Sequence, residues 1–198
     1  MARALRFCFY AMLRPGEFQK ACRQDLVLPC DLCRTDADPR LYLSVVLPKT
    51  RLTGARKQYA RADDLETARL WAFLAGDAEP QGKLWSASPT AFRTRWNLLC
   101  KEFQVPFNEV SGITPASLRA GGATALYEAT EDMELVRHRG RWATVKTVEI
   151  YVQEVGGERF LASLDASVRR KIADAARDER ELLYATIGDP VCEDHPRA

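Results

Sequence analysis

Three segments of the sequence carry residue types suited to chemistry at a phosphate group. One holds Arg14 and Glu17 around a Pro-Gly pair, a second holds Arg119 before two glycines, and a third holds Trp142 and Tyr151. A guanidinium donates two parallel hydrogen bonds to a phosphate and keeps its charge. With several cations around the phosphate, a hydroxyl can act as the nucleophile without a metal ion. The segments predict such chemistry if the fold brings them together.

Each segment taken alone also has an ordinary structural interpretation. Arg14 and Glu17 can form a surface ion pair, Trp142 can belong to the core, and Tyr151 can be a half-buried aromatic residue. The functional interpretation therefore depends on the three segments acting together.

The elements that position these segments are predicted to be mostly helical. Short β-type runs at 25–28, 41–47 and 56–60 are separated by turn signals, which indicates a small antiparallel sheet with a basic hairpin tip at 49–54. The predicted helices cover residues 3–13, 17–23, 65–74, 90–103, 114–129, 133–139, 145–152 and 158–184. Gly156-Gly157 is expected to break the chain before the last helix. The predicted fold class is α+β: a mainly helical body with a small antiparallel β-sheet.

Composition excludes several classes of protein. The 198 residues have a net charge of +2, with 46% apolar and 28% charged residues, which argues against a disordered or fibrous chain. No run approaches the roughly 18–20 apolar residues of a membrane span. Lys and Arg outnumber Asp and Glu by eleven to five in residues 1–60, which permits a polyanion-binding face.

The cysteine pattern predicts neither a disulfide framework nor a metal site. Cys30 and Cys33 form a single C-x-x-C in a turn-like setting, and a zinc site would require two further ligands. We expect free thiols, no bound metal and no cofactor. The basic, apolar segment 1–13 is better interpreted as an amphipathic core helix than as a targeting peptide.

In order and spacing, the three segments together resemble the catalytic domain of the tyrosine recombinase (phage integrase) family. Arg119 precedes Tyr151 by 32 residues and Trp142 precedes it by nine, as is typical of that family. Lys49 falls where the family keeps a β-hairpin lysine. The run Arg119-Ala-Gly-Gly-Ala-Thr and the Gly-Arg-Trp segment are most similar to recombinases of eukaryotic DIRS-type retroelements. The resemblance covers about residues 3–155.

The resemblance implies a mechanism for DNA strand breakage and rejoining. Tyr151 would attack the scissile phosphate, form a 3′-phosphotyrosyl link and expel a 5′-hydroxyl. Arg14 and Arg119 would hold the non-bridging oxygens, and Lys49 would protonate the leaving oxygen. Trp142 would donate its indole N–H to the phosphate. Glu17 would orient the site.

One position departs from the family pattern. The family's His-x-x-Arg is here Ala116-x-x-Arg119, so the usual histidine is missing. General acid–base help is typically worth about 10²- to 10⁴-fold in rate, so the loss would slow the reaction without abolishing it. His138 is a replacement only if the fold brings it close to the site.

The resemblance also suggests a domain organisation and partners. We expect residues 1–187 to form the catalytic domain, without the family's N-terminal DNA-binding domain, and 188–198 to be a disordered tail. The expected partners are double-stranded DNA and further copies of the chain on it. Candidates for contacts with DNA phosphates are Arg51, Arg56 and Lys57 at the hairpin, with Arg93 and Arg95 on the helix that follows Ser88. The place of action would be the nucleus if the host is eukaryotic and the cytoplasm otherwise.

Several alternatives stay open on the sequence alone. The chain can be a decayed DNA-binding relic of a mobile element, a type IB topoisomerase-like enzyme, or an unrelated helical scaffold. The apolar stripe of the last helix can pack on a neighbouring protomer or within the same chain.

Overall fold

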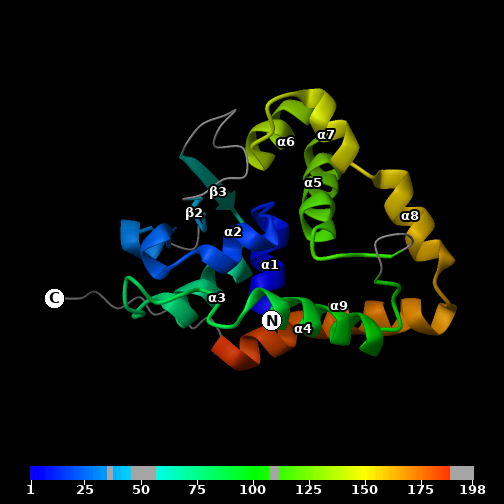
Figure 1. The fold of residues 1–198 in the computed structure, drawn as a ribbon, viewed down its shortest axis with the longest axis horizontal. Helices are drawn as coiled ribbons and strands as arrows, with labels where there is room; N and C mark the ends of the chain where they lie inside the picture. Colours follow the sequence, from blue (N-terminus) through cyan, green and yellow to red (C-terminus); the bar gives the residue numbers. More distant parts are fainter. Residues whose placement is uncertain (35–37, 46–56, 108–111, 188–198) are drawn as a thin grey trace.

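The computed structural model describes residues 1–34, 38–45, 57–107 and 112–187 (Figure 1). It is mainly helical with one three-stranded antiparallel sheet, which confirms the predicted α+β class. The α-helices are α1 (Ala2–Tyr10), α2 (Pro15–Lys20), α3 (Leu65–Ala75), α4 (Pro89–Glu102), α5 (Ser117–Thr130), α6 (Met133–Gly140), α7 (Val145–Tyr151), α8 (Glu154–Ser163) and α9 (Ala166–Ile187). Two short 3-10 helices, η1 (Arg23–Asp25) and η2 (Cys30–Leu32), precede and follow the first strand.

The sheet has the strand order β1 (Leu26–Val27), β2 (Leu41–Val45), β3 (Gln58–Ala62). Leu43 pairs with Leu26 on one side and with Ala60 on the other. Alternate residues of β2 are buried, because successive side chains of a strand point to opposite faces. The hairpin tip predicted at 49–54 lies outside the described residues.

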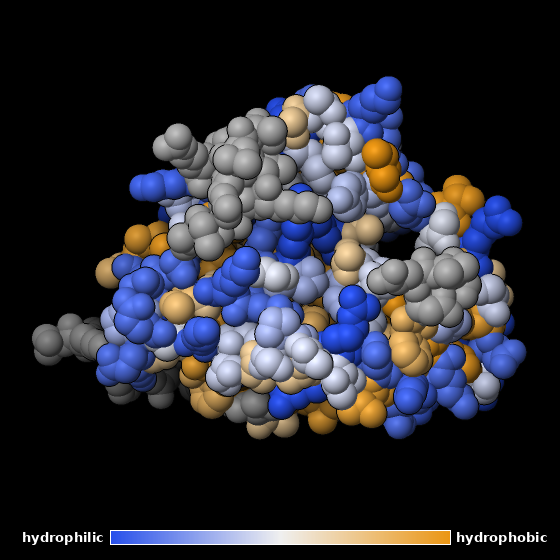
Figure 2. All heavy atoms as spheres, viewed as in Figure 1, coloured by the Kyte–Doolittle hydropathy of each residue, from blue (hydrophilic) through white to orange (hydrophobic). Residues whose placement is uncertain are grey.

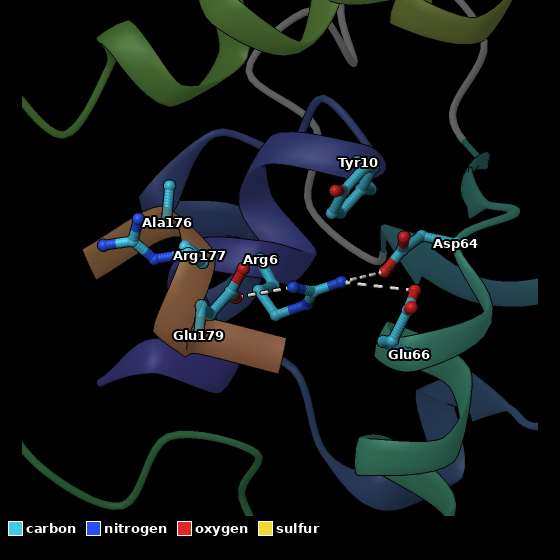
Figure 3. Close-up of a pocket in the computed structure, with 7 residues that line it drawn as sticks. All are labelled: Arg6, Tyr10, Asp64, Glu66, Ala176, Arg177 and Glu179. Atoms are coloured by element: carbon cyan, nitrogen blue, oxygen red, sulfur yellow. Dashed lines mark hydrogen bonds and ion pairs between the residues drawn. The ribbon is translucent and has the colours of Figure 1, made fainter. Parts of the chain in front are cut away.

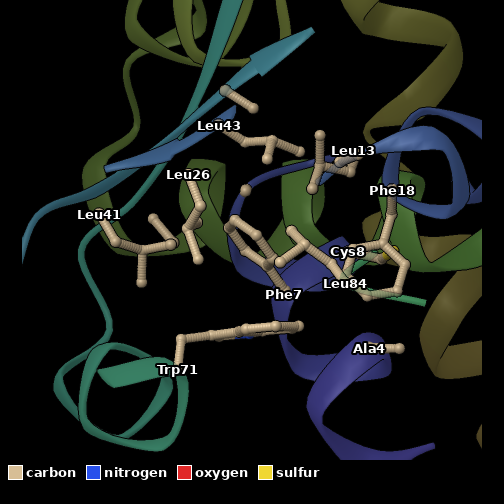
Figure 4. Close-up of a cluster of buried hydrophobic side chains, with 14 of the residues drawn as sticks. Ala4, Phe7, Cys8, Leu13, Phe18, Leu26, Leu41, Leu43, Trp71 and Leu84 are labelled. Carbon is tan, nitrogen blue, oxygen red and sulfur yellow. The ribbon is translucent and has the colours of Figure 1, made fainter. Parts of the chain in front are cut away.

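The main hydrophobic core lies between α1, α3 and the sheet (Figure 4). The Phe7 and Phe18 rings contact each other and both contact Trp71, at centroid distances between 5.5 and 6.2 Å. Leu41 and Leu43 of β2 cover the same cluster. This core fixes α1, whose C-terminal end carries the functional segment described below.

A second group of helices packs on α1. Helices α5, α6 and α7 contact one another and lie together at the top of Figure 1, with α5 against α1. The close approach requires Gly122, because a Cβ there would lie 2.1 Å from the Phe9 carbonyl oxygen. The Gly-Gly pair after Arg119 thus lets α5 reach α1.

The predicted ends of the first helices were wrong. Helix α1 ends at Tyr10 rather than at residue 13, and Pro15 begins α2 instead of closing the preceding helix. Proline suits the first position of a helix because that N–H has no partner inside the helix. Asp64 and Ser88 cap α3 and α4 as expected, by accepting from the backbone N–H groups of Thr67 and Ala91.

The prediction of one final helix at 158–184, preceded by a break at Gly156-Gly157, was also wrong. The two glycines lie in the first turns of α8, and the break comes at Leu164, which is extended and buried beside Val105 and Val168. Part of the apolar stripe packs within the same chain, beside Phe103, Val105 and Ile113, whereas Leu161 is exposed. Arg6 of α1 pairs with Glu179 (Figure 3) and Lys171 with Glu102, each ion pair adding to this docking.

Two further findings concern the cysteines and the possibility of a membrane-spanning helix. Cys30 and Cys33 are exposed free thiols at a 3-10 turn, as the sequence suggested. Across the described ranges, no helix has both the length and the apolar character needed to cross a membrane.

Candidate functional site

The end of α1 positions Arg14 and Glu17. Met12 adopts a left-handed conformation with φ of 47°, while the N–H groups of Met12 and Leu13 donate to the carbonyls of Phe9 and Cys8. This is the Schellman pattern of helix termination. It turns the chain so that Arg14 caps α2 and Glu17 lies in the first turn of that helix, accepting from the Arg14 N–H at 3.0 Å.

The end of α6 repeats this geometry. Arg141 has φ of 60°, and the N–H groups of Arg141 and Trp142 donate to the carbonyls of His138 and Arg137. The Trp142 ring folds back over Gly140, where a Cβ would lie 1.6 Å from the ring. Only glycine therefore fits before Arg141.

Arg119 connects the two helix ends. Its side chain projects from the first turn of α5 and is only 2% exposed. Its Nη1 donates to the Met12 carbonyl at 2.6 Å, and its Nη2 donates to the Gly140 carbonyl. Burial of a guanidinium requires such partners, and both are supplied by the helix terminations.

A carboxylate joins the remaining two arginines. Glu17 accepts from Arg14 Nη1 at 2.8 Å through Oε1 and from Arg141 Nη2 at 2.7 Å through Oε2. The Glu17 and Arg141 side chains are 5% and 7% exposed, so this is a buried pair rather than a surface one. We call Arg14, Glu17, Arg119 and Arg141 the arginine-rich cluster.

Two aromatic rings close the site beside Arg119. The Arg119 Cζ lies 4.5 Å from the ring centroid of Trp142 and 5.9 Å from that of Tyr151. The two rings contact each other at 4.7 Å with an interplanar angle of 41°. Tyr151 is the last residue of α7, half-buried, and Trp142 is buried in a second hydrophobic cluster with Val136 and Val148.

The electrostatics of the cluster show a surplus of positive charge. Burial, with Arg141 and Arg14 nearby, lowers the pKa of Arg119 from its usual value to about 9. Burial likewise lowers the pKa of Arg141. Although burial alone would raise it, the pKa of Glu17 is lowered because Arg141 and Arg14 stabilise the carboxylate. One carboxylate thus faces three guanidinia.

Three buried donors at the site also lack an acceptor. Arg119 Nε, Arg141 Nε and Trp142 Nε1 have no hydrogen-bond partner within the part of the chain that the structure describes. Buried polar groups without partners are rare and costly. A site with excess cations and unused N–H donors is suited to an anion, and phosphate is the anion that guanidinium groups hold best.

The structure brings five predicted site residues together: Arg14, Glu17, Arg119, Trp142 and Tyr151. The alternative of a surface pair for Arg14 and Glu17 was wrong, because Arg141 extends that pair into the interior. Trp142 belongs to the core and to the site at once.

Ala116 borders this cluster, because it shares a hollow with the Pro15-Gly16 pair between Arg14 and Glu17. Ala116 is exposed at the start of α5 and lines a hollow of about 590 Å³ with Pro15, Gly16 and Arg93. His138 is exposed on α6, and no contact found for its side chain links it to the cluster. Near the centre of the face seen in Figure 2, hydrophilic side chains gather between the α6–α7 part and the α4 part.

The predicted DNA-binding residues are only partly described. Arg93 and Arg95 are exposed on α4, with the Arg95 guanidinium 5.3 Å from the Trp85 ring, and Lys57 is exposed before β3. Lys49, Arg51 and Arg56 lie outside the described residues.

Sequence reasoning missed Arg141. Its place between Gly140 and Trp142 marked it as part of a motif, yet no local pattern signals an ion pair with a carboxylate 124 residues away. It also missed that the carbonyl oxygens of Met12 and Gly140 accept from Arg119. These acceptors are backbone atoms, and their positions are set by the ends of α1 and α6.

Comparisons with known proteins assign no family. No family model matches the chain, and no curated protein matches it. Among the described residues, no group of three or more His, Cys, Asp or Glu side chains is placed to hold a metal ion.

Proposed function

We propose that this chain is the catalytic domain of a site-specific DNA recombinase or integrase of the tyrosine recombinase type. It would break and rejoin DNA strands through a 3′-phosphotyrosyl intermediate. The observation that carries the proposal is the convergence of Tyr151, Trp142, Arg119 and Arg14, from separate helix ends, on one cation-rich site with unused donors.

In the proposed reaction, the Tyr151 hydroxyl attacks the phosphorus atom of a DNA phosphodiester. The tyrosyl oxygen–phosphorus bond forms as the Tyr151 hydroxyl releases its proton, and the bond from phosphorus to the 5′-oxygen breaks. The leaving 5′-oxygen takes up one proton, so the proton count balances. Arg14 and Arg119 stabilise the charge on the non-bridging oxygens, and more strongly in the pentacoordinate transition state than in the ground state.

The remaining groups have supporting roles. The indole N–H of Trp142 is an unused donor beside Arg119, and its ring packs against Tyr151. Lys49, which lies outside the described residues, is proposed as the general acid. The reverse reaction rejoins a strand, since the phosphotyrosyl bond conserves the energy of the phosphodiester; neither a nucleotide nor a metal is needed for the balance.

The proposal leaves two related activities as alternatives. The exposed methyl group of Ala116 supplies no donor where the family has histidine, which favours a slow enzyme or a decayed relic that binds DNA without cutting it. Relaxation of supercoiled DNA without a defined site would instead indicate type IB topoisomerase activity. Double-stranded DNA and further copies of the chain are the proposed partners.

The test is covalent trapping on nicked duplexes. The duplexes are taken in overlapping steps from the DNA that flanks the coding sequence. Cleavage beside the nick releases a short strand, which diffuses away, so the reaction cannot reverse and the adduct accumulates. We expect an SDS-resistant protein–DNA adduct with the wild-type chain and none with Tyr151→Phe.

Tyr127→Phe is the matched control for this test. Tyr127 packs in the same hydrophobic cluster as Tyr151, without a ring contact to Arg119 among those found, so this variant should form adduct normally. An adduct that persists in Tyr151→Phe would overturn the assignment of Tyr151 as the nucleophile. Salt-dependent DNA binding without an adduct on any substrate would overturn DNA cleavage.

A further inference from the structure

The residue left without a role in this scheme is Arg141. It occupies the left-handed position that ends α6, with φ of 60°. Glycine is the usual residue there, because a Cβ is disfavoured in this conformation. The chain instead places a long cationic side chain there. Gln104 and Glu131 adopt the same conformation after α4 and α5, so the inference depends on what the Arg141 side chain contacts.

The Arg141 side chain points inward from this position. It is 7% exposed, pairs with Glu17 at 2.7 Å, and makes longer contacts of 3.4 and 3.5 Å to the carbonyls of Ala11 and Met12. Its Nε has no acceptor among the residues that the structure describes. The guanidinium is therefore held in place with donors to spare.

The side chains of Arg141 and Arg119 meet at one backbone carbonyl. Both donate to the carbonyl oxygen of Met12, so two like charges share one acceptor in a buried site. Like charges repel each other, and an anion bound between them offsets that repulsion. Glu17 neutralises one of the three guanidinia and leaves two positive charges in the cluster. A phosphodiester carries one negative charge, and its pentacoordinate transition state carries two.

We infer that Arg141 is a third phosphate-binding guanidinium of this site, held ready by Glu17 while the site is empty. The inference rests on the proposed function for its substrate, a DNA phosphodiester, and it supplies a donor in a site where Ala116 has none. Glu17 acts as a positioning residue: its two carboxylate oxygens hold the guanidinium groups of Arg14 and Arg141 side by side. Phosphate oxygens then take the donors that have no protein partner.

The decisive variant is Arg141→Gly, tested with inorganic phosphate as the probe. Glycine suits the left-handed position, so the backbone of α6 gains from the change while the guanidinium is lost. A hydrogen bond to a charged group is strong enough that phosphate affinity should fall about tenfold or more. Affinity is measured by titration calorimetry on the full chain at low salt, well below the unfolding temperature.

Two further variants separate binding from structure. Arg177→Gln removes an equal charge from α9, where Arg177 is exposed and paired with Asp174, and phosphate affinity should not change. Arg141→Lys keeps the charge and loses the fork, so its affinity should lie between wild type and Arg141→Gly. Phosphate affinity that is equal in all variants, or absent in the wild type, would overturn the inference. Equal losses of phosphate affinity in Arg141→Gly and Arg177→Gln would overturn it too.

The same variants distinguish this inference from the proposed function. Trapping of Tyr151 on DNA at the wild-type rate in Arg141→Gly, with unchanged phosphate affinity, would refute the role of Arg141 and leave the recombinase proposal intact. Phosphate binding that requires Arg141, in a chain that never forms an adduct, would support the anion site and refute DNA cleavage.

Discussion

Two partly buried arginine clusters in the described part of the chain have opposite charge balance. In the arginine-rich cluster, Glu17 serves three guanidinia. In the second, which we call the carboxylate-rich cluster, Arg6 faces the carboxylates of Asp64, Glu66 and Glu179 at 2.5, 3.8 and 2.5 Å (Figure 3). Both clusters join segments that are distant in sequence. Burial of an arginine alone therefore does not distinguish an anion-binding site from an ion pair that only stabilises the fold.

The charge balance does separate them. Although burial opposes it, hydrogen bonds to Glu179 and Asp64 raise the pKa of Arg6 above its usual value. Burial and two neighbouring arginines lower the pKa of Arg119. Each Arg6 side-chain nitrogen has an acceptor, and Arg6 holds α1, α3 and α9 together, whereas Arg119 and Arg141 each keep a buried Nε donor without an acceptor among the described residues.

The largest expected effect comes from removing the single carboxylate of the arginine-rich cluster. Glu17→Gln keeps an acceptor for the Arg14 N–H and loses the charge that compensates Arg141. Leaving a buried charge without its partner typically destabilises a protein by about 3–5 kcal/mol, and we expect a loss in that range. Chemical denaturation in phosphate-free buffer measures it.

Phosphate should reverse much of that loss, since a ligand that binds only the folded state raises its stability. Asp64→Asn is the matched change in the carboxylate-rich cluster: it keeps an acceptor for the α3 cap and leaves Arg6 two carboxylates. We expect a smaller loss there and no specific recovery with phosphate. Equal recovery in both variants would remove the distinction between the clusters.

The next effect concerns the rate of the proposed reaction. Removing one preorganised donor for a developing oxyanion typically slows an enzyme by about 10²–10³-fold, and we expect this for adduct formation by Arg119→Gln. Arg6→Gln removes a guanidinium from the other cluster, where the Arg6 side chain is 11% exposed, and should leave the rate unchanged. Single-turnover trapping on a nicked duplex measures both, with circular dichroism to confirm that each variant is folded. A similar slowing in both would mean that stability, not charge placement, sets the rate.

The two clusters also show where sequence reasoning succeeded and where it did not. Caps such as Asp64 and Ser88 have local signatures, so helices α3 and α4 were predicted to within one residue. Arg14, Arg119, Trp142 and Tyr151 were found by residue type and spacing, because chemistry at a phosphate restricts both. These signals require no knowledge of tertiary contacts.

What the sequence did not indicate depends on long-range packing. Met12 and Arg141 adopt left-handed conformations that their residue types disfavour. The end of α1 therefore has no local signal, whereas Gly140 indicated the end of α6 to within one residue. The break at Leu164 follows from burial of that side chain beside Val105, which overrides the two glycines upstream. The ion pair of Arg141 with Glu17 forms only once α2 and the end of α6 meet.

The smallest expected effect is a pH dependence specific to Glu17. Its pKa in the folded chain is lowered from the usual 4.5, so the folded state releases this proton more readily than the unfolded state does. The stabilisation by Glu17 is therefore complete above the ordinary pKa and is lost as the pH falls through the lower, folded-state value.

The stability difference between wild type and Glu17→Gln should thus be constant near neutral pH and shrink below pH 4.5, with a slope of at most about 1.4 kcal/mol per pH unit for one proton. Urea titrations at a series of pH values measure it. The neutral glutamine matches the protonated glutamic acid, which is why the two proteins should converge in acid. A stability difference that persists unchanged at the lowest pH would mean that Glu17 stabilises the cluster by packing rather than by charge. The charge balance would then not distinguish the arginine-rich cluster from the carboxylate-rich one.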